Sequence, residues 1–165
     1  MKYDEERVKE IFSRSLEEAR EMLSSLSVAE GRKPDTKGLV GWVFEQTIRY
    51  CLSQELNLLG ITPLIEQQKT LIGRAKVDLL AGDVAIEIKA LGSFGNDAEK
   101  YKKYRKEAEK KGWKYFYLTL QETYSPYRKR MMQAFGKNRA FFLDTPDDWS
   151  RFIVELAKNF KRQII

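Results

Sequence analysis

The stretch that decides the fold runs from Lys76 to Lys89 and has the sequence KVDLLAGDVAIEIK. Two segments rich in apolar residues flank the dipeptide Gly82-Asp83, a pattern typical of a tight β-hairpin turn. If the turn is a two-residue loop, counting outward places Asp78 directly opposite Glu87. The stretch therefore predicts a hairpin that brings two carboxylates face to face.

The two faces of this hairpin differ in chemistry, because side chains alternate between the faces of a strand. Asp78, Glu87 and Lys89 are expected on one face, and Lys76 opposite Lys89. The other face is expected to carry four apolar side chains that enter a core: Val77, Leu79, Ile86 and Ile88. Like charges directly opposite on neighbouring strands destabilise a sheet, so the carboxylate pair requires a compensating cation. A divalent metal with a nearby lysine meets that requirement.

The composition excludes several classes of chemistry. The chain has one cysteine, Cys51, and no histidine. An intrachain disulfide, a cysteine-based zinc cluster, a Ser/His triad and a histidine-ligated metal are therefore all excluded. Carboxylate and lysine chemistry remains.

Length and hydropathy predict one domain. The 165 residues, 42% of them hydrophobic, are enough to bury an ordinary core without a cofactor or a disulfide. Residues 1–30 read as an N-terminal helical extension of this single domain. No apolar run approaches a membrane span, and the start of the chain lacks the hydrophobic segment of a secretory signal. We expect a protein with no membrane association, located in the cytoplasm.

Positive charge is concentrated in one segment. Residues 100–114 contain eight basic and two acidic residues, and so carry as much net charge as the whole chain, +6. Such a stripe is the footprint expected of a nucleic-acid partner, although lysine-rich helices often simply face water. A second basic cluster follows, with aromatic residues interleaved. The candidate nucleic-acid contacts are Lys76, Lys100, Lys102, Lys103, Arg105, Lys106, Arg128, Lys129 and Arg130.

Periodicity along the chain predicts an α/β fold. Helices are expected over residues 4–26, 36–56 and 97–111, from Ser125 to Gly136 and from Thr145 onward, with Asp4 and either Asn96 or Asp97 as N-caps. Strands are expected over residues 65–72, in the hairpin, over 114–121 and over 139–144. The strand 114–121 is the most continuously apolar and aromatic, and is expected at the centre of the sheet, buried on both faces. The result is a mixed sheet of about five strands with helices on both faces.

One carboxylate in the second predicted helix does not fit a surface position. Glu45 lies on the wide apolar stripe of helix 36–56, where an unpaired charge is costly to bury. The alternative is that Glu45 lies at the edge of the stripe and reaches water or an arginine. With the hairpin carboxylates nearby, Glu45 would complete a site of oxygen ligands that suits magnesium or manganese.

At these residues the chain resembles the PD-(D/E)xK nuclease superfamily. This superfamily has the restriction-endonuclease-like fold and includes restriction endonucleases and archaeal Holliday junction resolvases. The match consists of Asp78, then Glu87-Ile88-Lys89 after a hairpin, with Glu45 on the preceding helix. The resemblance implies that Asp78, Glu87 and the backbone carbonyl of Ile88 bind the metal, that Lys89 is catalytic, and that Glu45 is an accessory ligand.

The resemblance implies a Mg²⁺- or Mn²⁺-dependent endonuclease that hydrolyses DNA phosphodiester bonds, of a restriction-like or repair type. A homodimer is expected, since cutting two strands usually takes two sites, and RNA is not excluded as a substrate. A Holliday junction resolvase is an alternative within the same class. A catalytically inactive nucleic-acid-binding subunit with the same fold is an alternative from another class, and a protein-interaction domain that uses the first helix is a third.

Each candidate residue also has a purely structural interpretation. Lys89 could form a salt bridge with Asp78 or Glu87 at a sheet edge, a pairing that needs no metal. Lys76 could do the same or contact a phosphate. Asp83 is expected to be only a turn residue.

Overall fold

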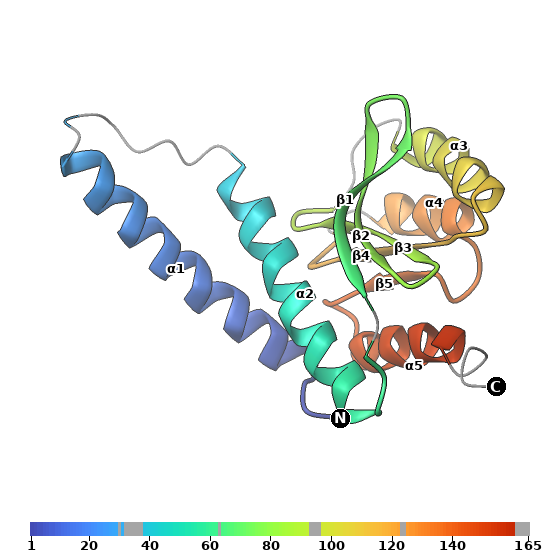
Figure 1. The fold of residues 1–165 in the computed structure, drawn as a ribbon, viewed down its shortest axis with the longest axis horizontal. Coiled ribbons are helices and arrows are strands. Elements are labelled where there is room, and N and C mark those ends of the chain that lie inside the picture. The colour runs from blue at the N-terminus through green and yellow to red at the C-terminus, as the bar shows by residue number, and fades with distance from the viewer. Residues whose placement is uncertain (30, 32–37, 63, 93–96, 123–124, 161–165) are drawn as a thin grey trace.

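The computed structural model describes residues 1–29, 31, 38–62, 64–92, 97–122 and 125–160. Within these residues the fold is α/β, as the sequence predicted (Figure 1). The helices are α1 (Glu5–Ala29), α2 (Leu39–Leu58), α3 (Asp97–Lys110), α4 (Ser125–Phe135) and α5 (Asp148–Phe160). The strands are β1 (Ile65–Ile72), β2 (Ala75–Ala81), β3 (Val84–Lys89), β4 (Lys114–Thr119) and β5 (Ala140–Phe142).

The predicted elements are all present, with shifts at their ends. Strand β1 has the expected bounds, whereas the last strand is shorter than the expected 139–144. The expected start of the second helix at Thr36 and the alternative cap Asn96 lie outside the described residues. Asp4 is an N-cap as expected, because its Oδ1 accepts the N–H of Arg7 at 2.8 Å.

The five strands form one mixed sheet in the order β1-β2-β3-β4-β5. The first three strands are an antiparallel meander, whereas β4 runs parallel to both β3 and β5. Strand β4 lies between two neighbours and is buried from Tyr115 to Thr119. The expectation of a strand buried on both faces is therefore confirmed, and β4 is an interior strand, although the middle strand of the sheet is β3.

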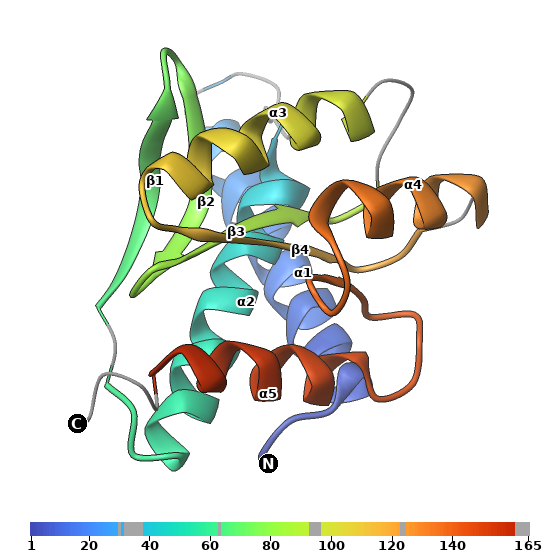
Figure 2. The same ribbon diagram turned by 90° about the vertical axis from the view of Figure 1, so that its right-hand side faces the viewer.

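Helices cover both faces of the sheet (Figure 2). Helices α3 and α4 pack on one face, where Tyr101 and Phe135 are fully buried. Helices α1, α2 and α5 contribute to a second core on the opposite face, which includes Phe44 and Phe152. Cys51 is buried in this second core, as expected of a small apolar residue.

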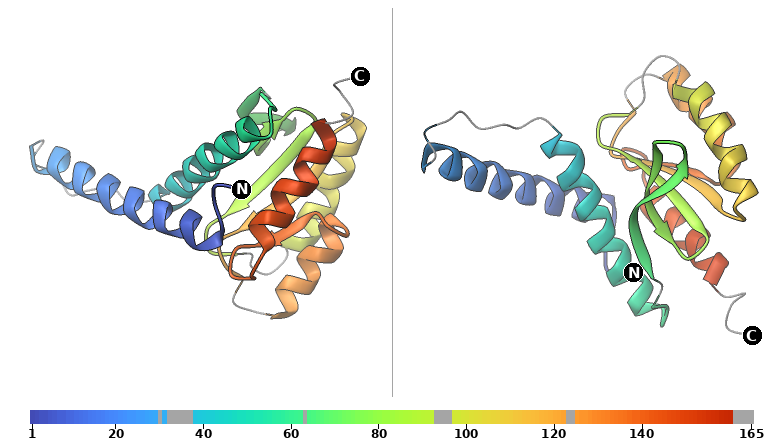
Figure 3. Two further views of the ribbon diagram at one scale, coloured as in Figure 1. Left: turned by 90° about the horizontal axis from the view of Figure 1, so that it is seen from below. Right: turned by 45° about the horizontal axis from the view of Figure 1, so that its top comes forward.

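The first helix belongs to that second core over its N-terminal half. The Phe12 ring meets the Phe44 ring edge-on, with centroids 5.2 Å apart. Two hydrogen bonds anchor the N-terminal end of this helix: Glu5 accepts the N–H of Trp149 at 2.7 Å, and buried Glu55 accepts the N–H of Tyr3 at 2.6 Å. The C-terminal end of α1 extends away from the sheet (Figure 3).

The hairpin turn has the predicted length, but the strands stop pairing earlier than expected. Ala81 pairs with Val84 across Gly82-Asp83, so the loop has two residues. The last pair of the β2–β3 ladder is Leu79 with Ile86. The predicted pairing of Asp78 with Glu87 is therefore wrong, and so is that of Lys76 with Lys89: Lys76 pairs with Thr70 of β1 and Lys89 with Thr119 of β4.

The face of Val77 is a second correction. Leu79, Ile86 and Ile88 lie in the core below α2 and α5 as predicted, but Val77 lies in the other core, against α3. The alternation breaks at Asp78, opposite Gln68, whose left-handed backbone (φ 54°) interrupts the regular pairing of β1 with β2. A backbone distortion of this kind is not visible in an apolar pattern.

None of the helices in the described part of the chain combines the length and apolarity needed to cross a membrane.

The aromatic core beneath α5 provides a test of the fold. Phe152 is fully buried and its ring lies 5.4 Å from the rings of both Phe141 and Trp149. We expect Phe152→Ala to lower the free energy of unfolding by about 3–5 kcal/mol, because it leaves a cavity. On the same helix, Val154 is half-exposed, and Val154→Ala should change stability by less than about 0.5 kcal/mol. Denaturant unfolding followed by circular dichroism measures both, and equal effects would contradict this packing.

Candidate active site

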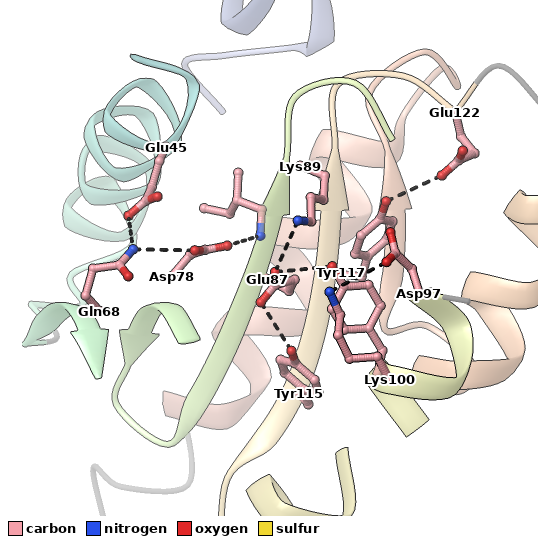
Figure 4. A network of polar contacts seen from close by, with 12 residues as sticks. Glu45, Gln68, Asp78, Glu87, Lys89, Asp97, Lys100, Tyr115, Tyr117 and Glu122 are labelled. Atoms are coloured by element: carbon pink, nitrogen blue, oxygen red, sulfur yellow. Dashed lines mark hydrogen bonds and ion pairs between the residues drawn. The ribbon is translucent and has the colours of Figure 1, made fainter. Parts of the chain in front are cut away.

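The predicted site residues come together at one place on the sheet (Figure 4). Glu45 comes from α2, Asp78 from β2, and Glu87 and Lys89 from β3. The charge of Asp78 acts on both other carboxylates, since it raises the pKa of Glu45 and that of Glu87. Helix α2 and the two strands of the hairpin therefore build one acidic centre.

Asp78 is fixed by the main chain of the neighbouring strand. Its Oδ2 accepts the backbone N–H of Ile88 at 2.7 Å, just beyond the last pair of the hairpin ladder. Burial raises the pKa of Asp78, while the Ile88 N–H and the charge of Lys89 act to lower it. The side chain of Asp78 thus takes the place of a ladder hydrogen bond. The contact from Ile88 is its N–H, whereas the resemblance predicts a metal contact through its carbonyl.

Gln68 of β1 joins Glu45 to Asp78, and sequence reasoning missed it. Its Nε2 donates to Oε1 of Glu45 at 3.0 Å and lies 3.5 Å from Oδ1 of Asp78. Its backbone has a positive φ, which costs an L-residue of order 1–3 kcal/mol and is common at functional sites. The only hint in the sequence is a run of polar residues, Glu66-Gln67-Gln68, in an otherwise regular strand.

Glu45 points toward the sheet, as the cleft-facing interpretation predicted. The side chain is half-buried, and its hydrogen-bond partner is Gln68, not an arginine. Burial is the main cause of its raised pKa, and repulsion from Asp78 adds to it, while the hydrogen bond from Gln68 opposes both. Glu45 and Asp78 therefore share one amide donor between two carboxylates.

Glu87 is buried between two tyrosines, contrary to the expectation that it faces Asp78 directly. Its Oε1 accepts a hydrogen bond from the Tyr101 hydroxyl at 3.3 Å, and its Oε2 accepts one from the Tyr115 hydroxyl at 3.2 Å. The Nζ of Lys89 lies 4.0 Å from Oε1. Burial and the charge of Asp78 together raise the pKa of Glu87 to about 8, so this carboxyl holds a proton near neutral pH.

The tyrosines form a buried layer behind the carboxylates. Tyr101, Tyr115 and Tyr117 are fully buried, and burial raises the pKa of Tyr101 and Tyr115. Their hydroxyls therefore remain protonated donors. Tyr117 extends the layer away from Glu87, because its hydroxyl donates to Oε2 of buried Glu122 at 3.4 Å. Sequence reasoning assigned these aromatic residues to the core alone.

Lys100, at the start of α3, is the predicted basic residue that reaches this centre electrostatically. Its Nζ lies 3.6 Å from Oδ1 of Asp97 and 4.8 Å from the centre of the Tyr101 ring. Its charge lowers the pKa of both Asp78 and Glu87. The basic stripe thus begins beside the carboxylates.

The other predicted basic residues lie on α3, α4 and β2. Lys102 pairs with Glu99 at 3.0 Å, and Arg105 pairs with Glu109 at 3.0 Å. Lys103 and Lys106 are exposed on α3, Lys129 and Arg130 are exposed on α4, and Lys76 is exposed on β2. Contact of these residues with nucleic acid stays a prediction.

Arg128 has a structural role that the sequence did not indicate. Its guanidinium donates to Oδ2 of Asp144 and Oγ1 of Thr145, both at 2.8 Å, and to the carbonyl of Glu122 at 3.1 Å. It also lies over the Phe142 ring, 4.6 Å from its centre. These contacts join α4 to the ends of β4 and β5, and they account for Arg128 without a ligand.

The oxygen donors of the site are of the kind that a hard cation prefers, but the candidate ligands are not arranged around one position. Glu45 and Asp78 supply carboxylate oxygens, Gln68 supplies an amide, and the mutual repulsion of the carboxylates is what a cation relieves. No group of three or more His, Cys, Asp or Glu side chains in the described residues is arranged to hold a metal. Glu87 is the ligand that stands apart, because both of its oxygens bond to tyrosines.

Comparison with known proteins gives no relative: no protein-family model, no curated protein and no solved structure matches the chain.

The positive φ of Gln68 gives a prediction that distinguishes the effect of its main chain on stability from the effect of its side chain. Gln68→Ala and Gln68→Gly both remove the amide, but only glycine adopts a positive φ without cost. We therefore expect the glycine variant to be about 1 kcal/mol more stable than the alanine variant. Thermal or denaturant unfolding measures the difference. An alanine variant as stable as the glycine variant would contradict the left-handed backbone.

Glu87 gives a prediction about pH. Its pKa in the folded protein, about 8, lies above the ordinary value of 4.5, so between these values the folded state holds a proton that the unfolded chain has released. The free energy of unfolding should therefore fall as pH rises from 4.5 to about 8. Glu87→Gln, which mimics the protonated carboxyl, should remove this part of the slope. Denaturant unfolding across this range, with a chelator present, measures it, and identical slopes would contradict a buried Glu87.

Proposed function

We propose that this protein is a metal-dependent endonuclease that hydrolyses DNA phosphodiester bonds, of a restriction-like or repair type. The observation that carries the proposal is the convergence of Glu45, Asp78 and Glu87 beside Lys89, with the pKa of each carboxyl raised. Clusters of titratable groups with shifted pKa values are a mark of functional sites. The resemblance of Asp78 and Glu87-Ile88-Lys89 to the PD-(D/E)xK nucleases supports the same function.

The chain's own residues have separate roles in this proposal. Asp78, Glu87, Glu45 and the Ile88 carbonyl would hold Mg²⁺ or Mn²⁺, and Glu87 would have to give up its hydrogen bonds from Tyr101 and Tyr115 to do so. A metal held there would supply Lewis-acid chemistry, polarising a phosphate oxygen and lowering the pKa of a bound water molecule. Lys89, already 4.0 Å from Glu87, orients the attacking water or balances the negative charge that develops on the phosphate.

The surface next to the carboxylates supports a polyanionic substrate. Lys100 is electrostatically coupled to Asp78 and Glu87, and the exposed lysines of α3 continue from it along one helix. Phosphates bound there release counterions, so binding should weaken steeply with salt. A cleavage centre at one end of a basic helix is an arrangement suited to a nucleic-acid backbone.

Cleavage assays test the proposal directly. Supercoiled plasmid and a synthetic four-way junction are incubated with Mg²⁺, Mn²⁺ or a chelator, and the substrate that is cut distinguishes a general endonuclease from a junction resolvase. We expect Asp78→Ala and Lys89→Ala each to lower the cleavage rate by at least about 100-fold, because each removes a charged group at the reacting phosphate. Light scattering of the protein–DNA complex gives its molar mass, which tests the expected homodimer.

A matched control guards against loss of folding. Glu66 lies on the same sheet but pairs with Lys69 at 3.1 Å on the surface, so Glu66→Gln should leave cleavage unchanged. Circular dichroism establishes that the variants are folded. Full activity in a folded Asp78→Ala or Lys89→Ala protein would refute the proposed mechanism.

One observation favours a second candidate, a catalytically inactive nucleic-acid-binding subunit. Glu87 is bonded at both oxygens by Tyr101 and Tyr115 and holds its proton near neutral pH, as a purely structural group would. Calorimetry separates the two candidates. Binding of Mg²⁺ or Mn²⁺ that disappears in Asp78→Ala supports the nuclease, whereas DNA binding that is indifferent to metal supports the inactive subunit.

A further inference from the structure

A polar pocket lies at the end of the parallel strands opposite to the carboxylate centre. It is a hollow of about 220 Å³ between the start of β4, the loop that joins α4 to β5, and the last turns of α5. Four cationic side chains, one carboxylate and one amide in its wall carry the argument: Lys114, Lys137, Arg139, Lys158, Glu155 and Asn159. None of them belongs to the carboxylate centre.

The charges in this pocket are not balanced. Glu155 is the carboxylate in the wall, and it is already paired with Lys158 at 2.7 Å. Lys114, Lys137 and Arg139 have no ion pair with any carboxylate in the part of the chain that the structure describes. Three cations thus face one hollow without a counter-charge, an arrangement that attracts an anion.

One of these cations, Lys114, is held in place by the side-chain amide of Asn159. The Nζ of Lys114 donates to Oδ1 of Asn159, which is 7% exposed. The Nδ2 of Asn159 in turn donates to the carbonyls of Glu155 at 2.9 Å and Leu156 at 3.3 Å. The amide is therefore fixed by the helix, and it fixes the ammonium at the floor of the pocket. Preorganised donors bind an anion with less loss of side-chain freedom.

A structural role does not account for the whole set. Cations near the C-terminal end of a helix stabilise its dipole, which explains Lys158 and, through Asn159, Lys114. Lys137 and Arg139 come from a different element, the loop before β5, in which Asn138 adopts a left-handed conformation (φ 59°) between them. Both residues line the pocket, although the dipole of α5 explains neither of them.

The pocket and the carboxylate centre lie at opposite ends of the β3–β4 ladder and on opposite faces of the sheet. Lys114 pairs with Val84 at the start of the β3–β4 ladder, whereas Lys89 pairs with Thr119 at its other end. Five residues of strand correspond to about 17 Å. Phe116 lines the pocket on the face of the sheet that α5 covers, and the tyrosines that hold Glu87 lie on the face that α3 covers.

We propose that this pocket binds a phosphate dianion, either inorganic phosphate or the terminal phosphate of a nucleic-acid strand. A terminal phosphate carries about −1.5 to −2 charges and three acceptor oxygens, and so matches three cations better than a backbone diester with a single charge. The guanidinium of Arg139 offers paired donors to two of these oxygens. The site does not depend on nuclease activity.

Titration calorimetry with inorganic phosphate tests the site, on the full chain with a chelator present so that metal chemistry plays no part. We expect Lys137→Ala/Arg139→Ala to weaken phosphate binding by at least about tenfold, since it removes two charge-assisted contacts. The matched control is Arg14→Ala/Arg20→Ala, which removes the same charge from two exposed positions on α1 that do not line the pocket, and it should change binding by less than about twofold. Lys137→Ala alone, at an exposed side chain, serves if the double variant does not fold.

Two oligonucleotides of the same sequence, one with a 5′-phosphate and one with a 5′-hydroxyl, identify the source of the phosphate. Tighter binding of the phosphorylated strand, lost in Lys137→Ala/Arg139→Ala, supports a nucleic-acid end. Equal binding of both strands together with phosphate binding in calorimetry supports free phosphate. Absence of phosphate binding, or phosphate binding that the pocket variants leave unchanged, would overturn the proposal.

Discussion

The hydrogen bond from the Ile88 N–H to the Asp78 carboxylate is the contact on which the site depends. It forms at the point where the hairpin ladder ends, after the pair of Leu79 with Ile86. A carboxylate that accepts a main-chain donor is fixed by the strand itself and not by a flexible partner. Asp78 is thereby held at a defined position between β3 and Gln68, and the acidic centre is organised around it.

The balance of charge around Asp78 explains why the centre has two parts. On one side Gln68 lies between Asp78 and Glu45, and an amide donor partly offsets two nearby negative charges. On the other side Glu87 is buried against tyrosine hydroxyls, and a raised pKa lets it avoid a second buried charge. Both arrangements reduce the repulsion between neighbouring carboxylates. Glu45 and Asp78 share the amide donor of strained Gln68, whereas Glu87 holds a proton.

The basic surfaces of the molecule fall on different elements and have different roles. On α3 the lysines are exposed, and several are paired with acidic residues one turn away. On α4 the cluster divides: Arg128 joins the helix to the end of the sheet, while Lys129 and Arg130 face solvent. Lys114, Lys137 and Arg139 are unlike both groups, because all three line one hollow beside α5 and none has an ion pair among the described residues. A count of basic residues alone does not distinguish these roles.

The sequence by itself determined the α/β class, the order of elements and the turn of the hairpin. Apolar periodicity and the Gly82-Asp83 dipeptide are local signals, and both act before any tertiary contact forms. The same signals placed Glu45, Asp78, Glu87 and Lys89 on neighbouring elements.

Only the tertiary structure decided how those side chains are oriented. Gln68 enters the site because β1 is distorted opposite Asp78, and Tyr115 reaches Glu87 because β4 lies beside β3. Such contacts depend on the twist and neighbours of a strand, which a pattern with a period of two does not contain. The sequence thus identified the charged residues of the site, and packing selected the uncharged partners that hold them.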